Sequence, residues 1–541
     1  MATDILEVEW QYAALDTRPV KRWLETQLPT GFSVEAIGTK ELDDTYFDTA
    51  AWHLHRAGYT CRVRRKGAEA ELTLKSMAEP RDGMRSRREL TEVLDSPGAQ
   101  PSTAPGACGA LIRAVAGRNA LQPIFRLQTR REVFNVSNND GQFGEIALDE
   151  TSIPVGEDRP VRLSRVEIEV DQNAVSLAKP FVQVLVGANR LTEAGTSKFE
   201  SALIATGQSV PSTAAEFGNT SVDPEMTAGE VAYAVLRKQF KALRANEPGT
   251  RLGEDIEALH DMRVASRRLR AAMAAFRPYL TPRMERLRVQ LGWVAAALGE
   301  VRDLDVQIER MEEWRASFEA ERAAALEAVE GVLQTRRRAA RKRMLAVLDS
   351  RRYERLCESF GNSLRIGPPR SFVPGRAPIL AVAPDMVERR YKRVRKLGDQ
   401  IKKDSPPDLY HHLRIDAKKL RYSLEFVGNG IYGKPALEFS ARVTAMQDVL
   451  GLHQDAYVAI DMLQEVADSS GRRLGPATLM AMGSISERYR AYAVDLRAKF
   501  PAVYKPLAGE EWKRLLKLME SRRPTERAPK APAPMAAKIT Q

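Results

Sequence analysis

Short runs of alternating apolar and polar residues fill the first two hundred positions of the chain. Such alternation is typical of β-strands that bury one face, and turn residues such as Lys66-Gly67 separate the runs. Strands are predicted at 5–12, 60–65, 71–75, 87–94, 132–136, 145–149 and 165–170, and helices near 20–28, 108–116 and 175–186. The N-terminal part is therefore expected to be an antiparallel sheet with flanking helices.

Beyond about residue 225 the apolar residues recur at i, i+3, i+4 and i+7, which predicts helices. These are expected at 231–243, 259–276, 287–316, 319–347 and 411–427. Between the two patterns, residues 207–224 are rich in Ser, Thr, Pro and Gly and are predicted to be a linker. Four domain-level segments result. They are a first domain at 1–206, the linker, a helical domain at 225–518 and a disordered tail at 519–541.

Charged residues share one face of several predicted strands, since residues two apart in a strand point the same way. The pairs are Glu7 with Glu9, Arg62 with Arg64, and Glu167 with Glu169. The opposite faces are apolar. A closed or nearly closed antiparallel sheet with a charged interior uses both faces, although ordinary solvent-facing charges explain any single pair. In such an interior, Arg and Lys suit phosphate oxygens, and the carboxylates require a divalent cation to tolerate phosphate.

Net charge divides the chain into two unlike halves. The 541 residues carry +12 overall, but residues 1–210 hold 25 basic and 29 acidic residues, so 58 basic and 42 acidic residues lie in the remainder. This asymmetry favours a partner that is a polyanion: nucleic acid, anionic lipid or polyphosphate. A merely solvated basic surface is the alternative.

Several classes of protein are excluded by composition. We find no apolar run long enough to span a membrane and no signal peptide at the N-terminus. The three scattered cysteines form neither a disulfide framework nor a metal-binding spacing, so a cytoplasmic location is expected.

An internal repeat marks the helical part. Residues 260–270 and 411–421 both read H-x-x-R-[VI]-x-x-[RK]-[RK]-L-R, 151 positions apart. Leu298-Gly299 with Asp303 recurs as Leu450-Gly451 with Asp455 at nearly the same offset. The helical domain is therefore predicted to be two similar four-helix units. Asp303 and Asp455 are expected to be N-caps or network residues that orient basic side chains.

Each repeat presents four basic groups on one side of its helix. At about 100° per residue, offsets of 3, 7 and 10 from the His fall within roughly an 80° arc. The two stripes are His260, Arg263, Arg267 and Arg270, and His411, Arg414, Lys418 and Arg421. Bringing such charges together is unfavourable without an anion, so we predict that both stripes line one anion-binding groove.

Other ligands fit the stripes less well. Metal binding by His is disfavoured, because no His or Cys follows four residues on. Few aromatic residues lie nearby, which disfavours single-stranded nucleic acid, whereas charge alone leaves duplex DNA open. Further basic runs, at 237–244, 336–343 and 389–396, either extend the groove or form exposed faces.

The helical half resembles the CHAD domain. Both H-x-x-R elements, the run L-G-E-V-R-D-L-D from Leu298 and the later L-G-x-x-x-D stand in the expected order. The resemblance implies a helical module that binds polyphosphate, sometimes at polyphosphate granules.

The N-terminal half resembles the CYTH domain of the triphosphate tunnel metalloenzymes. The matching elements are Glu7-x-Glu9, Tyr46-Phe47-Asp48-Thr49, Arg62-x-Arg64, Leu72 to Lys75, Arg88-Glu89, Arg130-Arg131, Glu145 to Asp149, Glu167-x-Glu169 and Ser197-Lys198. The opening E-x-E-x-K of the family ends here in Gln11, a neutral residue where the family has Lys.

The CYTH resemblance also implies roles for single residues. The implied triphosphate ligands are Arg62, Arg64, Lys75, Arg88, Arg131 and Lys198. The implied metal-binding residues are Glu7, Glu9, Asp149, Glu167 and Glu169, with Glu7 and Glu9 also as catalytic residues. The implied cofactor is Mg²⁺ or Mn²⁺.

Together these observations predict an α+β protein. An N-terminal antiparallel β tunnel or barrel with flanking helices precedes an all-α domain of two pseudo-symmetric four-helix bundles. The expected function is binding of inorganic polyphosphate, with metal-dependent hydrolysis of inorganic triphosphate in the tunnel. The alternatives are a non-enzymatic polyphosphate-binding or granule-targeting protein with a degenerate tunnel, which Gln11 favours, and a nucleic-acid binder.

Overall fold

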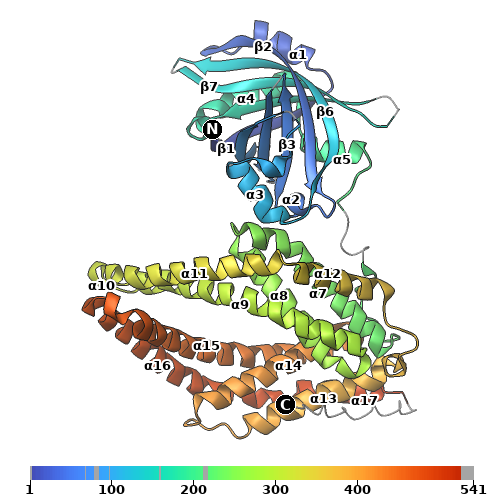
Figure 1. The fold of residues 1–541 in the computed structure, drawn as a ribbon, viewed down its shortest axis with the longest axis vertical. Helices are drawn as coiled ribbons and strands as arrows, with labels where there is room; N and C mark the ends of the chain where they lie inside the picture. Colours follow the sequence, from blue (N-terminus) through green and yellow to red (C-terminus); the bar gives the residue numbers. More distant parts are fainter. Residues whose placement is uncertain are drawn as a thin grey trace. The chain divides into compact units, whose positions relative to one another are not determined.

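The computed structural model describes residues 3–67, 69–77, 84–96, 98–139, 141–156, 160–210 and 217–524. The chain divides into two compact units (Figure 1). The first comprises Met1–Ser212 and Pro248–Asp255, and the second Thr213–Glu247 and Ile256–Gln541. No helix among these residues is long and apolar enough to cross a membrane.

The first unit is a closed antiparallel ring of eight strands. Its strands are β1 (Thr3–Ala14), β2 (Phe32–Thr49), β3 (Tyr59–Lys66), β4 (Glu69–Ser76), β5 (Met84–Leu94), β6 (Leu121–Asn138), β7 (Gly141–Ile153) and β8 (Val161–Val170). Around the ring the order is β5-β4-β3-β2-β6-β7-β8-β1, and β1 pairs with β5 to close it. A short strand, β9 (Thr192–Glu193), adds to β1. The predicted tunnel-like sheet is confirmed.

Helices cover the outside of the ring in two places. The helices of this unit are α1 (Arg18–Thr26), α2 (His53–Arg56), α3 (Ala107–Ala116), α4 (Val175–Asn189) and α5 (Lys198–Ala205). Trp10 and Ile168 bury their side chains with Phe181 of α4 in one core. Leu74 and Leu90 bury theirs with Ile112 of α3 in a second core. Because these apolar faces look outward, the alternate residues of the same strands face the interior of the ring.

Strand β2, which has 18 residues like β6, was not among the predicted strands. Its pairing with β6 shifts register between Ala36 and Gly38, where Gly38 has a φ of 143°. A bulge of this kind changes which residues face inward, so the period of two breaks in the middle of the strand.

The second unit is entirely helical in its regular structure. Its α-helices are α7 (Ala228–Leu252), α8 (Ile256–Ala275), α9 (Pro282–Ala316), α10 (Ala320–Ala325), α11 (Glu327–Leu348), α12 (Arg351–Ile366), α13 (Ile379–Gly398), α14 (Pro407–Tyr432), α15 (Lys434–Ser470), α16 (Pro476–Tyr504) and α17 (Glu510–Ser521). Helix α8 packs on α9, which packs on α11, and in parallel fashion α14 packs on α15, which packs on α16 (Figure 1).

The start points of these helices follow the sequence repeat. Helices α7 and α8 begin 151 residues before α13 and α14, and α9 begins 152 residues before α15. The residues that precede α7 and α13, Thr227 and Pro378, are themselves 151 apart and form a β-bridge to each other. Contact between equivalent positions is the mark of a two-fold relation. The duplication is thus visible in the helix order, while the division into two four-helix bundles stays a prediction.

Two segment boundaries can be compared with the helices. Helix α17 continues to Ser521, so the first three residues of the expected tail are helical. The expected tail beyond residue 524, and residues 211–216 of the expected linker, lie outside the described residues.

Candidate functional site

The interior of the ring is a cavity of about 450 Å³ lined mainly by charged side chains. Seven are cationic and eight are carboxylates. The cations are Arg62, Arg64, Lys75, Arg85, Arg87, Arg131 and Lys198. The carboxylates are Glu7, Glu9, Glu71, Glu89, Glu145, Glu167, Glu169 and Glu200. Along each strand these side chains stand two residues apart, on the face opposite the apolar cores. The predicted interior of mixed charge is therefore confirmed.

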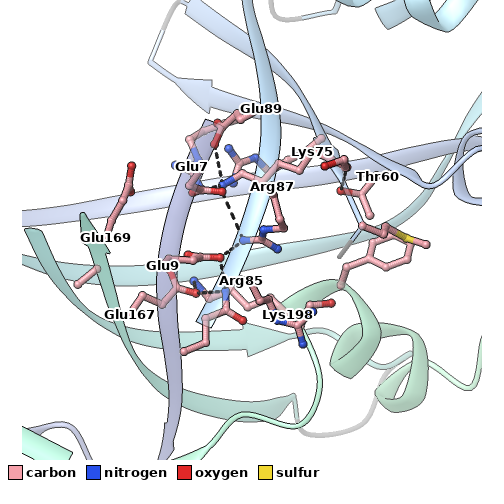
Figure 2. Close-up of a pocket in the computed structure, with 18 of the residues that line it drawn as sticks. Glu7, Glu9, Thr60, Lys75, Arg85, Arg87, Glu89, Glu167, Glu169 and Lys198 are labelled. Carbon is pink, nitrogen blue, oxygen red and sulfur yellow. Dashed lines mark hydrogen bonds and ion pairs between the residues drawn. The ribbon is translucent and has the colours of Figure 1, made fainter. Parts of the chain in front are cut away.

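One group of ion pairs joins β1, β4 and β5. Lys75 Nζ lies 2.6 Å from Glu7 and 2.9 Å from Glu89. Arg87 lies between Glu7 and Glu9 and pairs with both (Figure 2). The register explains this, because Arg87 stands directly opposite Glu7 in the β1–β5 ladder. Burial lowers the pKa of Lys75, but Glu7 and Glu89 outweigh it and raise that pKa above its usual value.

A second group joins β6, β7, β8 and α5. Arg131 donates to Asp149 at 2.8 and 2.6 Å and to Glu167 at 2.5 Å. Lys198 pairs with Asp149 and lies 3.0 Å from Glu167. Burial alone would raise the pKa of Glu167, yet Lys198 and Arg131 outweigh it and hold the pKa well below its usual value. Glu167 is therefore ionised at any physiological pH.

The third group consists of two arginines of β3 that contact an aspartate of β2. Arg64 makes a bidentate contact with Asp44, at 2.7 and 2.8 Å, and Arg62 lies 3.8 Å from the same carboxylate. Burial would raise the pKa of Asp44, but the two guanidinium groups overcome it and lower the pKa to about 2. Asp44 thus neutralises part of the charge that two predicted phosphate ligands carry.

Gln11 lies among the carboxylates of the cavity. Its Nε2 donates to Glu9 at 2.8 Å and to Glu167 at 3.2 Å, and the side chain is buried. Its Oε1 is buried and has no hydrogen-bond partner in the part of the chain that the structure describes. The neutral amide replaces a lysine charge at this point of the CYTH pattern, and it uses its donors to hold two carboxylates.

Most of the residues predicted for the tunnel lie together in this cavity, and two differ. Arg88 lies on the outer side of β5, where it pairs with Asp4 at 2.8 Å. It shares the face of Leu90, which is buried in the outer core, so Arg88 does not line the cavity, whereas Arg85 and Arg87 of the same strand do.

Asp149 is the second difference. It lies beneath the cavity surface, with no exposed area, and both Arg131 and Lys198 hold it. This position suits Asp149 to orienting Arg131 and Lys198 rather than to binding a metal ion.

Sequence reasoning overlooked six charged residues that line the cavity. They are Glu71, Arg85, Arg87, Glu89, Glu145 and Glu200. The sequence did carry a signal, because residues two apart in a strand point the same way. Arg85, Arg87 and Glu89 stand two apart on β5, on the face opposite buried Leu90, and Glu145 on β7 stands next to buried Ile146.

Carboxylates also gather on three adjacent strands. Glu145 pairs with Glu169 across β7 and β8, and Glu169 pairs with Glu9 across β8 and β1. Burial, followed by the nearby charge of Glu7, raises the pKa of Glu169. Glu169 stands apart from the ion pairs (Figure 2). Hard oxygen donors of this kind suit Mg²⁺ or Mn²⁺, although as the described side chains stand no three acidic, His or Cys groups have metal-ligand spacing.

In the helical unit the two predicted stripes meet where α8 packs on α14. Arg267 donates to the hydroxyl of Tyr422 at 2.8 Å, and Arg268 lies 3.3 Å from Glu425. The charges around Lys418 come from both stripes. They are Arg267, Arg414, Arg263 and Arg421. Burial, followed by these four charges, lowers the pKa of Lys418 to about 7. The two stripes therefore form one cationic surface, here called the α8–α14 groove.

The groove has paired and unpaired cations. Arg263 donates to Asp303 at 2.8 Å and Arg421 lies 3.2 Å from Glu425. Arg414 and Lys418 make no hydrogen bond or ion pair among the described residues. His411 Nδ1 lies 2.6 Å from Gln454 Oε1. Arg270 of α8 likewise makes no hydrogen bond or ion pair among the described residues, so cations of both helices are available to an anion.

The two aspartates of the repeat have separate outcomes. Asp303 lies inside α9 and Asp455 inside α15, so neither is an N-cap. Asp303 is a network residue, through Arg263, as one of the two alternatives expected. Asp455 instead lies 3.6 Å from Arg310 of α9.

The other basic runs have mostly internal partners. In the 336–343 run, Arg336 lies 2.9 Å from Glu465, Arg337 lies 2.5 Å from Asp305, and Arg343 pairs with Glu300. In the 237–244 run, Arg237 donates to the backbone of Leu364. These arginines join helices, which removes them as the leading candidates for polyanion binding.

Comparison with known proteins adds relatives at low identity. An uncharacterised protein of Mycobacterium tuberculosis is 26% identical over 470 residues, which cover 80% of this chain and 84% of that protein. The CHAD domain structure from the plant Ricinus communis is 25% identical, covers 53% of this chain and 95% of that one, and has a TM-score of 0.45. A putative adenylyl cyclase from Hippeastrum, described as having a dominant triphosphatase activity, is 20% identical, covers 38% of this chain and 98% of that one, and has a TM-score of 0.30.

Two family models match the chain in succession. The CYTH domain model matches residues 18–215, which contain most of the ring, and the CHAD domain model matches residues 234–464, which contain both stripes. The order is the one that the sequence motifs predict. The chain is a two-domain protein of the CYTH and CHAD families, with the CYTH domain first.

Proposed function

We propose that the CYTH tunnel binds inorganic triphosphate and hydrolyses it with Mg²⁺ or Mn²⁺, and that the CHAD domain binds long-chain polyphosphate. The observation that carries the first part is the convergence of seven cations on one cavity from β3, β4, β5, β6 and α5. Membership of the two families supports a function related to triphosphate or polyphosphate. The α8–α14 groove supports the second part.

Binding in the tunnel is an exchange of anions. Lys75, Arg87 and Arg131 each contact a carboxylate in this structure. Triphosphate oxygens would replace those carboxylates, and the arginines can bind them bidentately. The exchange leaves carboxylates without their partners, so a cation is needed beside them.

Glu9, Glu145 and Glu169 are the residues that would hold this metal ion, because they stand in register on three adjacent strands. When bound, the ion would supply neutralising charge and polarise a phosphoryl oxygen. Glu7 and Glu9 remain the proposed water-activating residues. Glu169 is a further candidate, since its raised pKa makes it a stronger base than the ion-paired Glu167.

The tunnel assignment is tested by phosphate release from inorganic triphosphate, with and without Mg²⁺ or Mn²⁺. The wild type should release phosphate only with metal, and Glu9→Gln should lower the rate by about 10²-fold or more. Thr60→Val, which alters a neutral residue of the same cavity, is the matched control. Equal rates for wild type and Glu9→Gln would remove Glu9 from the chemistry.

A second candidate function is a tunnel that binds triphosphate without cleaving it, in a polyphosphate-binding or granule-targeting protein. Gln11 favours it, because its neutral amide cannot stabilise developing negative charge as lysine does. Phosphate release from triphosphate, compared between wild type and Gln11→Lys, decides between the two functions. Release by the Lys variant alone would establish the binding-only function.

Polyphosphate binding by the CHAD domain is tested with Arg263→Ala plus Arg414→Ala, one cation from each stripe. Affinity for long-chain polyphosphate should fall at least about tenfold and the dependence on salt should weaken. The matched control is Lys419→Ala, whose side chain lies 2.8 Å from Asp416 off the stripe. Competition with duplex DNA at fixed ionic strength separates the nucleic-acid alternative, since preferential binding of DNA would contradict the proposal.

A further inference from the structure

The aspartates of the two sequence repeats have different partners. In the first repeat, Asp303 Oδ1 accepts a hydrogen bond from Arg263 Nη2 at 2.8 Å. In the second repeat, Asp455 Oδ2 lies 3.6 Å from Arg310 Nη2, and the backbone oxygen of Asp455 accepts from Arg310 Nη1 at 3.2 Å. Arg414, the equivalent of Arg263, makes no hydrogen bond or ion pair among the described residues. The two repeats therefore differ in whether an aspartate neutralises a cation of the groove.

The sequence supplies a reason for this difference. Residues 298–303 of α9 correspond to residues 450–455 of α15 at an offset of 152, and the same offset makes Met462 the equivalent of Arg310. Met462 is buried and apolar, so it cannot hold a carboxylate. Arg310 thus holds Asp455 from α9, while the equivalent position of α15 offers Asp303 no cation. One position at which the repeats differ explains both pairings.

The glycines of the two repeats show the same difference. A Cβ built at Gly299 of α9 would lie 3.6 Å from Nε of Arg263. At the equivalent Gly451 of α15, a Cβ would meet no described atom outside its own helix within 4 Å. Arg263 thus lies against α9, whereas Arg414 does not lie against α15 in this way. Both arginines still belong to one groove, since the charges of both act on Lys418.

An internal carboxylate and a polyanion compete for the same guanidinium group. Asp303 has to release Arg263 before phosphate oxygens can replace it, whereas Arg414 is open to an anion without this exchange. The side chain of Asp303 is 61% exposed, and ion pairs of such exposure are weak. We therefore expect each exchange of this kind to change the affinity for a polyanion by about two- to fivefold.

We propose that Arg310 is a positioning residue of the α8–α14 groove. It holds Asp455 away from Arg414 and so makes the second repeat the stronger half of the polyanion-binding surface. Asp303, which pairs with Arg263, has the opposite effect and weakens the first repeat. Arg310 acts through Asp455 rather than by contact with the anion. This assignment rests on the proposed binding of polyphosphate by the CHAD domain.

A double-mutant cycle in the full-length protein tests the role of Arg310. Titration calorimetry would measure the affinity for long-chain polyphosphate of wild type, Arg310→Met, Asp455→Asn and the double variant. Arg310→Met, which introduces the residue type of the second repeat, should weaken binding about two- to fivefold, because Asp455 can then pair with Arg414. Most of this loss should disappear in the Asp455→Asn background. An equal loss in both backgrounds would show that Arg310 acts by its own charge, which would overturn the proposal.

The opposite effect is tested at Asp303. Asp303→Asn should strengthen binding about two- to fivefold and steepen its dependence on salt, because Arg263 would then exchange ions from solution for phosphate. The gain should vanish in the Arg263→Met background. The matched control is Asp416→Asn, which removes the same charge from an aspartate that pairs with Lys419 off the stripe. A gain that persists without Arg263, or that Asp416→Asn reproduces, would contradict the competition.

Single substitutions compare the two repeats directly. Arg414→Met should lower the affinity for polyphosphate about two- to fivefold more than Arg263→Met does. Equal losses, or a larger loss for Arg263→Met, would overturn the inequality of the repeats, even if Arg310→Met fails to fold. The proposed function fails separately: a wild type that does not bind polyphosphate would refute it. Normal binding by the wild type with equal losses in the two single variants would refute the present inference alone.

Discussion

Protonation of Lys418 should make polyphosphate binding depend on pH. The pKa of this amine is lowered to about 7 by burial and by Arg267, Arg414, Arg263 and Arg421. A bound polyanion stabilises the charged form and raises the pKa, so binding takes up a proton above pH 7. Affinity is therefore greatest below pH 7 and falls as the pH rises.

The magnitude follows from the free protein. With a pKa of about 7, the charged fraction of Lys418 falls from about ten-elevenths at pH 6 to about one-eleventh at pH 8. Kd for polyphosphate should rise about tenfold over this interval, equivalent to about 1.4 kcal/mol.

Titrations at pH 6, 7 and 8 and constant ionic strength, in buffers of different ionisation enthalpy, would give both Kd and proton uptake. Lys418→Met should bind more weakly at pH 6 and lose this part of the pH dependence, while Lys419→Met keeps it. Both variants keep the histidines of the groove, so the difference between the two variants isolates Lys418. The same slope in wild type and Lys418→Met, with no difference in proton uptake, would refute the reasoning.

Three further predictions concern single side chains. Arg87→Met should weaken triphosphate binding at least about tenfold, because Arg87 lines the cavity, whereas Arg88→Met, on the outer face, should change the affinity by less than about twofold. Calorimetry measures both affinities, and a larger loss for Arg88→Met would contradict the orientation of β5. Asp44→Asn should lower the free energy of unfolding by about 2–3 kcal/mol, because Arg62 and Arg64 lose their shared partner. In thermal melts, added triphosphate should restore much of this loss. An unchanged melting temperature would show that Asp44 does not stabilise the two arginines. Arg337→Met should reduce stability but leave polyphosphate affinity unchanged, since Arg337 is paired with Asp305; a large loss of affinity would place α11 in the binding surface.

The sequence was most informative where a regular period met a repeated motif. Alternation in β1, β3 and β8 predicted a ring with charge inside, and the 151-residue offset predicted equivalent helices at α8 and α14. Both are properties of local geometry, in which each residue's direction follows from its neighbours.

Two expectations depended on more than local spacing. Arg88 was assigned by its place in a motif, although it shares the outward face of buried Leu90. For Asp303 and Asp455 an N-cap was one of two expectations, but both residues lie inside long helices, and Asp303 contacts Arg263 as the other expectation had it. Motif identity alone does not fix which way a side chain points.

Partners across the fold could not be predicted at all. The contacts of Arg131 with Asp149 and Glu167 depend on the register of β6, β7 and β8, and that register is set by the closure of the whole ring. Charge balance in the tunnel is therefore a property of the assembled sheet rather than of any segment.

The pairing of tunnel cations with internal carboxylates gives the two domains different responses to salt. In the tunnel, Glu7, Glu167 and Asp44 already serve as the counterions of Lys75 and the arginines, so loading it with phosphate releases few ions to the solvent. On the α8–α14 groove, Arg414 and Lys418 make no ion pair with a described carboxylate, so ions from solution balance their charge and a bound polyanion would release those ions. Raising the ionic strength should accordingly strip polyphosphate from the helical domain while leaving triphosphate in the tunnel, which makes the salt concentration a means of addressing one domain at a time.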